Sequence, residues 1–334
     1  SIYLPREERI KHVEAILRLF WKPFNDEVFG KSKTWYNCGD FGCSVVCKKV
    51  WRGKKVDYEP FHAMGPFIGN YIFEEAVPLV DLIDKLGLDA IEMGHVTAWI
   101  FDAIEHGLLQ PSEVGISDKP IFDPLRLARE LIKGFVEGST EVLKLIAENG
   151  IRVSARKLDD MFHDRVLKVG KSFRDLVVYA AYGSNGYMTP NLYWAPGMVA
   201  PMYVLGRYWT NYTPTFMGPE DFAKSSLDRA MAEALIDDAG LCRFHRGWAE
   251  PVLEKLYVEI TGMGPNKDLY REIAEYSIKA NAQPTPWESE RARDLVSTMA
   301  REVGSKEWSF EDYEDYVEWW RRFKGFVDAK LGVG

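Results

Sequence analysis

Three of the four cysteines in the 334-residue sequence, Cys38, Cys43 and Cys47, fall within ten residues, and the fourth is the distant Cys242. Three thiolates from one short segment and a fourth from far along the chain complete a set of four, the ligand set of many iron–sulfur clusters. Structural zinc also accepts four thiolates, but its ligands usually come as two close pairs. Unliganded buried cysteines are the remaining interpretation. The spacing favours a four-cysteine iron–sulfur cluster.

Two short segments share the pattern D-x-x-G-L followed by Asp or Cys, at Asp84–Asp89 and Asp237–Cys242. Gly followed by Leu at a helix end is typical of an ordinary Schellman cap. However, Asp84 and Asp237 fall in the last helical turn, where the helix dipole disfavours negative charge by about 0.3–1 kcal/mol. We therefore expect each carboxylate to serve a ligand that donates hydrogen bonds, such as a pterin ring. Cys242 would bring the second ligand beside the cluster.

Helices are expected to position these residues. Apolar side chains recur at helical spacing, as on the face formed by Ile10, Val13, Ile16, Leu17 and Phe20. Helices are predicted over residues 6–20, 71–86, 89–107, 124–149, 157–168, 171–182, 219–239, 249–260, 267–279, 287–303 and 309–330. A small hairpin is predicted between residues 45 and 56, around the turn signal Arg52-Gly53.

The predicted fold class is mostly α, with two helical domains packed around a cofactor cavity and little β-structure. The passage from Gly183 to Gly197 interrupts the helical periodicity and is rich in aromatic residues, so we expect it to line a cavity. A domain of residues 1–183 would carry the three clustered cysteines and the first D-x-x-G-L segment. A domain of residues 184–334 would carry the second segment and the fourth cysteine.

Charge and hydropathy argue against two classes of partner. The net charge is −8, and no stretch concentrates Lys and Arg enough to follow a phosphate backbone, so we expect no nucleic-acid partner. No run of 18 apolar residues is present, so we expect no membrane span. The first residues lack the layout of a secretory signal. The expected location is cytoplasmic.

Together, these segments resemble the aldehyde:ferredoxin oxidoreductase family of tungsten enzymes. Family members hold tungsten through two pterin dithiolenes beside a 4Fe–4S cluster, and their second and third domains each carry a D-x-x-G-L pterin motif. The resemblance implies that Asp84 and Asp237 bind pterin amine groups. It also implies that the backbones of Leu88 and Leu241 contact the pterins. The implied cluster ligands are Cys38, Cys43, Cys47 and Cys242.

The resemblance implies an activity and a set of cofactors. An aldehyde would be oxidised to the carboxylic acid, with electrons passing through the cluster to ferredoxin. The implied cofactors are a tungsten (or molybdenum) bis-pterin and a 4Fe–4S cluster, with magnesium as an optional member. Residues 188–198, 206–212 and 244–250 look closest to the glyceraldehyde-3-phosphate:ferredoxin oxidoreductase branch. That phosphorylated aldehyde is therefore the candidate substrate.

A further segment, Tyr58-Glu59, resembles the family's E-Y-E-T stretch, whose last Glu lies near the metal. We expect Glu59 to be a buried catalytic carboxylate that takes a proton from the attacking water or the hydrated aldehyde. Tyr58 would orient the substrate carbonyl. A surface glutamate and a core tyrosine are the alternatives. His62 and His245 lie close to these segments in the sequence, and His95 is expected to point inward.

The sequence departs from the family pattern in three respects, one of which is that residues 206–212 lack the His that the family often has near the metal. The clustered cysteines are spaced C-x4-C-x3-C, whereas the family usually has C-x2-C-x3-C. The resemblance also covers only the second and third domains, so the expected partners include a β-rich N-terminal domain or subunit. The chain would then be a fragment or one half of a split enzyme. Two rival functions are an iron–sulfur electron-transfer or scaffold subunit without pterin, and a zinc-stabilised helical interaction protein.

Overall fold

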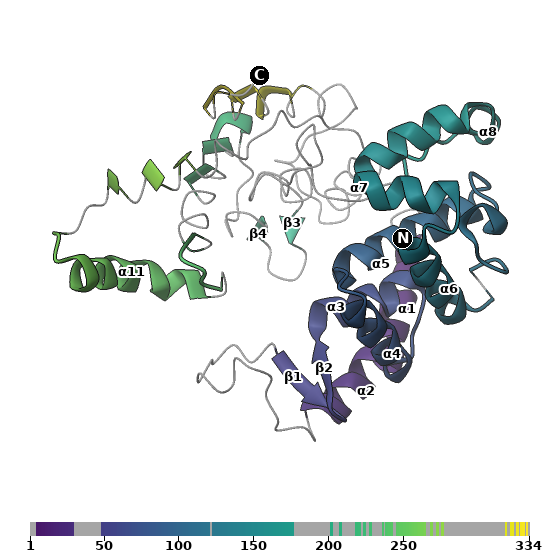
Figure 1. Cartoon of the computed structure of the whole chain (residues 1–334), viewed down its shortest axis with the longest axis horizontal. Helices are drawn as coiled ribbons and strands as arrows, with labels where there is room; N and C mark the ends of the chain where they lie inside the picture. The colour runs from purple at the N-terminus through teal and green to yellow at the C-terminus, as the bar shows by residue number, and fades with distance from the viewer. Residues whose placement is uncertain are drawn as a thin grey trace. The chain divides into compact units, whose positions relative to one another are not determined.

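A computed structural model of the chain describes residues 5–29, 48–120, 122–176 and parts of 201–332. The chain divides into two compact units, Ser1–Val177 and Val178–Gly334, and each is considered by itself. The described residues are mostly helical, which confirms the predicted fold class (Figure 1). The domain boundary predicted after residue 183 lies outside the described residues.

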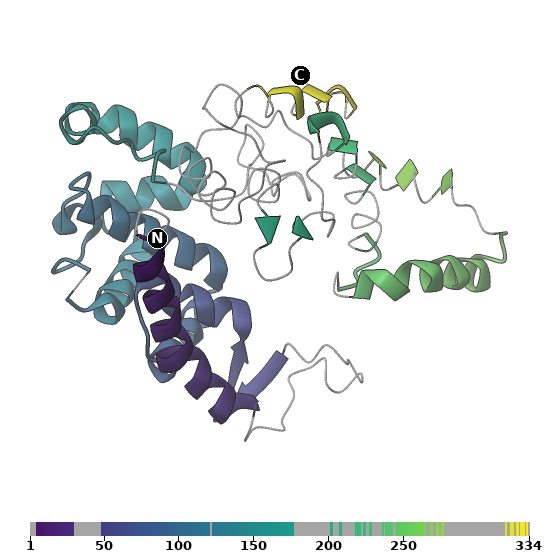
Figure 2. The same ribbon diagram turned by 180° about the vertical axis from the view of Figure 1, so that it is seen from behind.

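The first unit begins with a run of helical segments that Figure 2 brings to the front. They are α1 (Arg6–Ile16), a π-helical turn (Leu17–Trp21), α2 (Lys22–Phe24) and a second π-helical turn (Asn25–Phe29). Phe20 and Phe24 are buried, as expected for the inner face of this run. Ile10, Val13 and Leu17 are instead exposed. The predicted apolar face is therefore covered only at its C-terminal end.

The predicted hairpin is confirmed by β1 (Lys48–Trp51) and β2 (Lys54–Asp57), which pair antiparallel. Arg52 and Gly53 have φ values of +50° and +73°, the left-handed pair that a type I′ turn requires. The Trp51 ring packs edge-on against Phe73, with centroids 5.3 Å apart. That contact fastens the hairpin to the helices that follow.

Three helices surround the core of this unit: α3 (Tyr58–Ala63), α4 (Phe73–Lys85) and α5 (Ala90–Glu105). A 3₁₀ turn (Pro66–Ile68) joins the first two. The largest fully buried side chains include Phe61, Phe73, Leu79, Ile83 and Ile100. Helices α3 and α5 approach closely at Ala63 and Gly94, because a Cβ added at Gly94 would lie 2.5 Å from the Ala63 Cβ.

The helix predicted over residues 124–149 is wrong as a single element. The structure has α6 (Pro124–Glu137) and α7 (Glu141–Met161), which is kinked at Gly150, followed by α8 (His163–Val169). Gly138 ends α6 with φ of +60°, and the Thr140 hydroxyl accepts the Leu143 N–H at 3.2 Å to cap α7. Apolar periodicity continues across this break, which explains the merged prediction.

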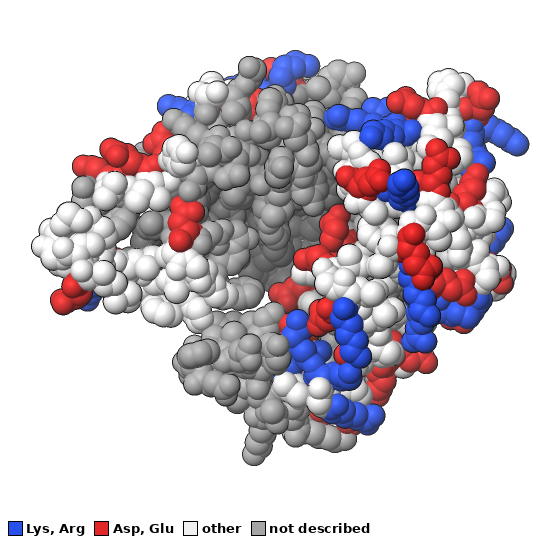
Figure 3. All heavy atoms as spheres, viewed as in Figure 1, with Lys and Arg blue, Asp and Glu red and all other residues white. Residues whose placement is uncertain are grey.

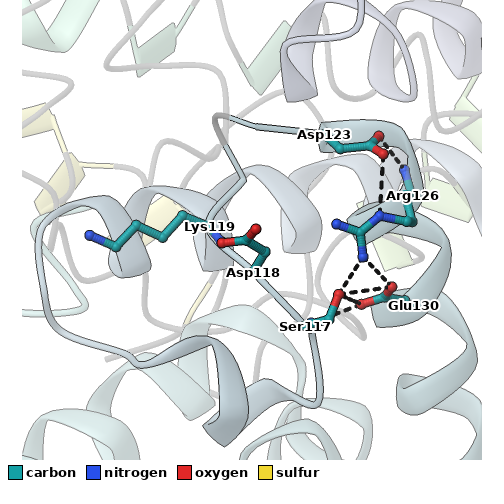
Figure 4. A network of polar contacts seen from close by, with 6 residues as sticks. All are labelled: Ser117, Asp118, Lys119, Asp123, Arg126 and Glu130. Atoms are coloured by element: carbon teal, nitrogen blue, oxygen red, sulfur yellow. Dashed lines mark hydrogen bonds and ion pairs between the residues drawn. The ribbon is translucent and has the colours of Figure 1, made fainter.

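A loop before α6 is held by Arg126, whose guanidinium contacts Ser117, Asp123 and Glu130 (Figure 4). The Ser117 N–H also donates to the Glu130 carboxylate at 2.8 Å. These groups are exposed, and Lys, Arg, Asp and Glu side chains intermix on the face of this unit that Figure 3 shows. The network is best understood as support for the loop.

Residues 171–176 form turns rather than the start of the predicted helix 171–182, the rest of which lies outside the described residues. The Asp159 carboxylate accepts the Phe173 N–H at 2.6 Å and pairs with Arg174 at 2.6 Å. The Trp99 indole donates to the Phe173 carbonyl at 3.0 Å. Burial raises the pKa of Asp159, while Arg174 opposes that rise. These tertiary bonds hold the turns and override the local helical pattern.

In the second unit the described strands are β3 (Pro201–Met202) and β4 (Arg207–Tyr208), which pair antiparallel. The longest helix described there is α11 (Arg246–Thr261), which ends at Gly262 with φ of +67°. Glu220 and Arg322 form an ion pair at 2.7 Å that joins the start and end of the unit. Among the helices described in either unit, none is long and apolar enough to cross a membrane.

Candidate functional site

The first D-x-x-G-L segment ends α4 and leads into α5. Gly87 has φ of +72°, and the Leu88 N–H donates to the Ile83 carbonyl at 3.1 Å, the long-range bond of a Schellman cap. The Asp89 carboxylate then accepts the Glu92 N–H at 2.7 Å and caps α5. The segment therefore joins two helices through a hydrogen-bonded turn.

The second segment repeats this cap in the other unit. Gly240 has φ of +68°, and the Leu241 N–H donates to the Ile236 carbonyl at 3.0 Å. The Cys242 carbonyl accepts the His245 N–H at 2.9 Å just before α11 begins. The last residue of each segment thus leads into the following helix in a hydrogen-bonded turn.

The shared cap determines what the backbone of each segment offers to a ligand. The N–H groups of Leu88 and Leu241 are already engaged with Ile83 and Ile236. The carbonyl is the other backbone group of each leucine, and it is an acceptor. Both segments therefore suit a ligand that donates hydrogen bonds. Asp237, the expected counterpart of Asp84, lies outside the described residues.

Asp84 lies at an accessible helix end, with its side chain 41% exposed and its Oδ2 atom 3.3 Å from the Lys55 Nζ atom on β2. One turn earlier, the Asp81 carboxylate lies 2.7 Å from the Nζ atom of Lys54 and 2.8 Å from the Nζ atom of Lys85. Hydrogen bonds from Lys54 and then Lys85 lower the pKa of Asp81. Lysines thus offset the negative charge that the dipole of α4 disfavours, and the Asp84 carboxylate remains open to a ligand.

The predicted cluster ligands fall on both units. Cys38, Cys43 and Cys47 lie outside the described residues, and their arrangement stays a prediction. Cys242 is exposed and forms no disulfide. No group of three or more His, Cys, Asp or Glu side chains within the described part of the chain could hold a metal ion. The accessible thiol of Cys242 fits a cluster whose other ligands come from a different segment.

Tyr58 and Glu59 form the first turn of α3, directly after β2. The Tyr58 side chain is 54% exposed, and its ring stacks on Trp21 with centroids 4.7 Å apart. Glu59 is also exposed, so the expectation that it is buried in this unit is wrong. Its expected role as a proton acceptor stays a prediction, and its exposure leaves it accessible to water.

His62 lies one helical turn after Tyr58, and the two rings are nearly parallel, with centroids 6.1 Å apart and planes at 14°. The Trp21 ring lies at a similar distance, 6.0 Å, with planes at 13°. The Nδ1 atom of His62 is buried and has no hydrogen-bond partner among the described residues. Burial lowers the pKa of His62, which keeps the ring neutral.

His95 reaches the same region from α5, because the Phe67 ring contacts both imidazoles. The Phe67 centroid lies 6.2 Å from that of His62 and 4.9 Å from that of His95. Burial lowers the pKa of His95, Asp89 raises it, and His62 lowers it further. Burial also raises the pKa of Glu92, and Asp89 adds to that rise.

The sequence analysis did not identify Glu92. The available signal was a charged residue three positions before His95 on a mostly apolar helix, since residues at that spacing are neighbours on a helical surface. The contact between His62 and His95 through Phe67 joins α3 to α5, and no local pattern encodes it.

Comparison with known proteins adds information at the level of the family. Residues 21–281 match the family model described as aldehyde ferredoxin oxidoreductase, domains 2 & 3. The chain is similar to an uncharacterised protein of Methanocaldococcus jannaschii, with 39% identity over 354 positions that cover 99% of this chain and 56% of that protein.

Other similar proteins carry functional names. The glyceraldehyde-3-phosphate:ferredoxin oxidoreductase of Pyrococcus furiosus is 39% identical over 335 positions, which cover 94% of this chain and 51% of that protein. A tungsten-containing aldehyde ferredoxin oxidoreductase of Pyrococcus abyssi is 25% identical over 232 positions, which cover 61% of this chain and 35% of that protein. The chain spans about half the length of the two relatives that are 39% identical to it.

Proposed function

Because the chain belongs to the aldehyde ferredoxin oxidoreductase family, whose second and third domains it carries, we propose that it provides much of the cofactor-holding part of a tungsten–pterin oxidoreductase. The enzyme would convert an aldehyde and water to a carboxylic acid, an electron pair and two protons. The observation that carries the proposal is the pair of matching helix caps at Leu88 and Leu241, the second of which leads directly into Cys242.

The side chains that would hold the pterins are acceptors. Asp84 and Asp237 would each accept hydrogen bonds from pterin amine groups. The carbonyls of Leu88 and Leu241 would add a backbone acceptor beside each carboxylate, since their N–H groups are engaged in the caps. The Lys55 ammonium group, 3.3 Å from the Asp84 carboxylate, would offset part of the negative charge at that helix end.

The cluster would be held by a separate set of thiolates, namely Cys38, Cys43, Cys47 and Cys242. The exposed position of Cys242 supports this role. When bound, the tungsten–pterin group would supply two-electron redox chemistry and the cluster a path for single electrons to a ferredoxin. The resemblance also allows a magnesium ion, but no group of side chains that could bind it is found among the described residues.

Proton transfer at the reacting centre would fall to the start of α3. The exposed Glu59 carboxylate is accessible to water and would take a proton from the attacking water or the hydrated aldehyde. Tyr58, whose ring is fixed against Trp21, would orient the aldehyde carbonyl. Similarity to the Pyrococcus furiosus enzyme makes glyceraldehyde-3-phosphate the first aldehyde to test.

The proposed partners follow from the part of the relatives that this chain does not span. A β-rich N-terminal domain or subunit would complete the cofactor site, and ferredoxin would receive the electrons. The proposed location is the cytoplasm, where glutathione and thioredoxin keep thiols reduced.

The test is an anaerobic assay of the complete protein. The complete protein is this chain together with the part that corresponds to the uncovered half of the relatives. We expect glyceraldehyde-3-phosphate or another aldehyde to reduce ferredoxin or a viologen dye. A protein that contains both iron and tungsten but oxidises no aldehyde would contradict the proposed activity. Iron without tungsten would instead support an electron-transfer subunit, and a colourless protein with stoichiometric zinc would support a structural zinc site.

A further inference from the structure

One ionisable ring follows the predicted catalytic carboxylate on the same short helix. Glu59 and His62 lie three positions apart on α3. Side chains at this spacing are neighbours on a helix surface, with Cβ atoms roughly 5–6 Å apart. Tyr58, four positions before His62, lies on the same face and packs its ring nearly parallel to the imidazole. The carboxylate, the phenol and the imidazole therefore share one short helix face.

His62 has an unmet capacity for hydrogen bonding. Its Nδ1 atom is buried without a partner among the described residues, and leaving a polar atom unpaired costs about 1–3 kcal/mol. The rings of Trp21, Tyr58 and Phe67 pack around the imidazole, and none of these side chains makes a hydrogen bond with its Nδ1 atom. Buried unsatisfied groups are few in native proteins, and a functional role is one accepted reason for them.

His95 is a second ionisable ring in the same region of the structure. It contacts the same Phe67 ring from α5, and the close approach of Ala63 and Gly94 fixes the crossing of the two helices. Asp89 raises the pKa of His95 and His62 lowers it, and burial lowers the pKa of both histidines. Because a charge on His62 disfavours a charge on His95, the pair takes up one proton more readily than two.

We propose that His62 is the acceptor to which Glu59 passes the proton that it takes from water or the hydrated aldehyde, and that His95 limits the pair to a single proton. This proposal rests on the proposed function. Each turnover releases two protons and an electron pair as the aldehyde becomes the acid. The electrons go to the proposed ferredoxin, one proton moves from the Glu59 carboxyl group to the His62 ring and then to solvent, and the other proton is released to solvent without passing through His62. His62 thereby returns Glu59 to its ionised form, so it acts through Glu59 and does not touch the substrate.

The kinetic test compares the complete wild-type protein with H62Q, H62A and the control H106Q. The control alters the histidine that directly follows the C-terminal end of α5. We expect H62Q to lower kcat by roughly 10- to 100-fold with little change in KM. The decline of kcat at acid pH should also change in H62Q, because the need for a neutral His62 is removed while Glu59 must still be ionised to take up a proton. Added imidazole should partly restore kcat in H62A, and H106Q should behave as wild type.

A second test measures protonation without activity. Exchange of the imidazole Cε1 hydrogen with deuterium, followed by mass spectrometry of the complete protein, reports the pKa of each histidine. We expect His62 to titrate below the ordinary value of 6.5 and the pKa of His95 to rise in H62Q. An H62Q enzyme with normal kcat would overturn the proposal, and so would a lowered kcat with an unchanged acid limb. A wild-type protein that oxidises no aldehyde refutes the proposed function first, and this proposal falls with it.

Discussion

The Nζ atom of Lys55 lies 3.3 Å from the Oδ2 atom of Asp84, which links strand β2 to the end of helix α4. Lys54 makes a parallel link to Asp81 at 2.7 Å. The hairpin that contains both lysines begins directly after Cys47. Two ion pairs therefore connect the segment next to the predicted cluster ligands with the helix that ends in the first D-x-x-G-L segment.

The first prediction concerns Asp84. In the complete protein, D84N should lower the content of pterin and tungsten, because an amide is a weaker acceptor than a carboxylate for amine donors. The free energy of unfolding should change by no more than about 1 kcal/mol, since the Lys55 pair is exposed. D81N is the matched control, because it removes the neighbouring carboxylate on the same helix. Equal pterin content in D84N and D81N would show that Asp84 does not bind the pterin.

The second prediction concerns the helix caps. Gly87 and Gly240 adopt φ values of +72° and +68°, and a side chain costs about 1–2 kcal/mol in that region. G87A and G240A should each lower the free energy of unfolding by about that amount in denaturant titrations. G87N should cost less, because Asn tolerates the left-handed conformation. Equal losses in G87A and G87N would show that backbone strain is not the cause.

The third prediction tests the crossing of α3 and α5. In G94A the new Cβ would lie 2.5 Å from the Ala63 Cβ and 2.8 Å from its carbonyl oxygen. We expect the free energy of unfolding to fall by about 1–3 kcal/mol, because the two helices must move apart. G325A is the control, since a Cβ at that helical glycine would meet nothing within 4 Å. Similar stability in both variants would mean that the close approach is not maintained.

The fourth prediction is a dependence of stability on pH. Burial lowers the pKa of His62 and His95 in the folded protein below 6.5. The unfolded chain therefore binds protons more readily, and the free energy of unfolding should fall as the pH drops below 6.5. The raised pKa of Glu92 acts in the opposite sense, because the folded chain then retains a proton above pH 4.5.

Urea unfolding at about pH 7.5 and about pH 5.5 measures this dependence. The double variant H62Q/H95Q should lose less stability between these pH values than wild type does. H163Q, which alters an exposed histidine on α8, should lose as much as wild type. An unchanged loss in the double variant would mean that the two rings are not desolvated in the folded protein.

The sequence predicted the local features of the fold well. The Arg52-Gly53 turn required two positive φ values and has them, and the Gly-Leu pairs at Gly87 and Gly240 end helices as expected. In these cases a few adjacent residues carry the whole signal. The break between α6 and α7 also had local signals, in Gly138 and Thr140, but continuous apolar periodicity concealed them.

Features that depend on distant contacts were not predictable in the same way. Residues 171–176 are held as turns by Asp159 and Trp99, which belong to other helices. Burial is the largest cause of the lowered pKa of His62 and of the raised pKa of Glu92, and that burial comes from tertiary packing. The types of the site residues were readable from spacing, whereas their burial depends on tertiary packing.

Metal analysis of the anaerobically purified complete protein tests the central claim most directly. We predict about four iron atoms with matching sulfide and about one tungsten atom per complete protein. C242S should lose cluster iron, because it removes one of the four predicted thiolate ligands. A wild-type protein with neither iron nor tungsten, or with stoichiometric zinc in their place, would contradict the account.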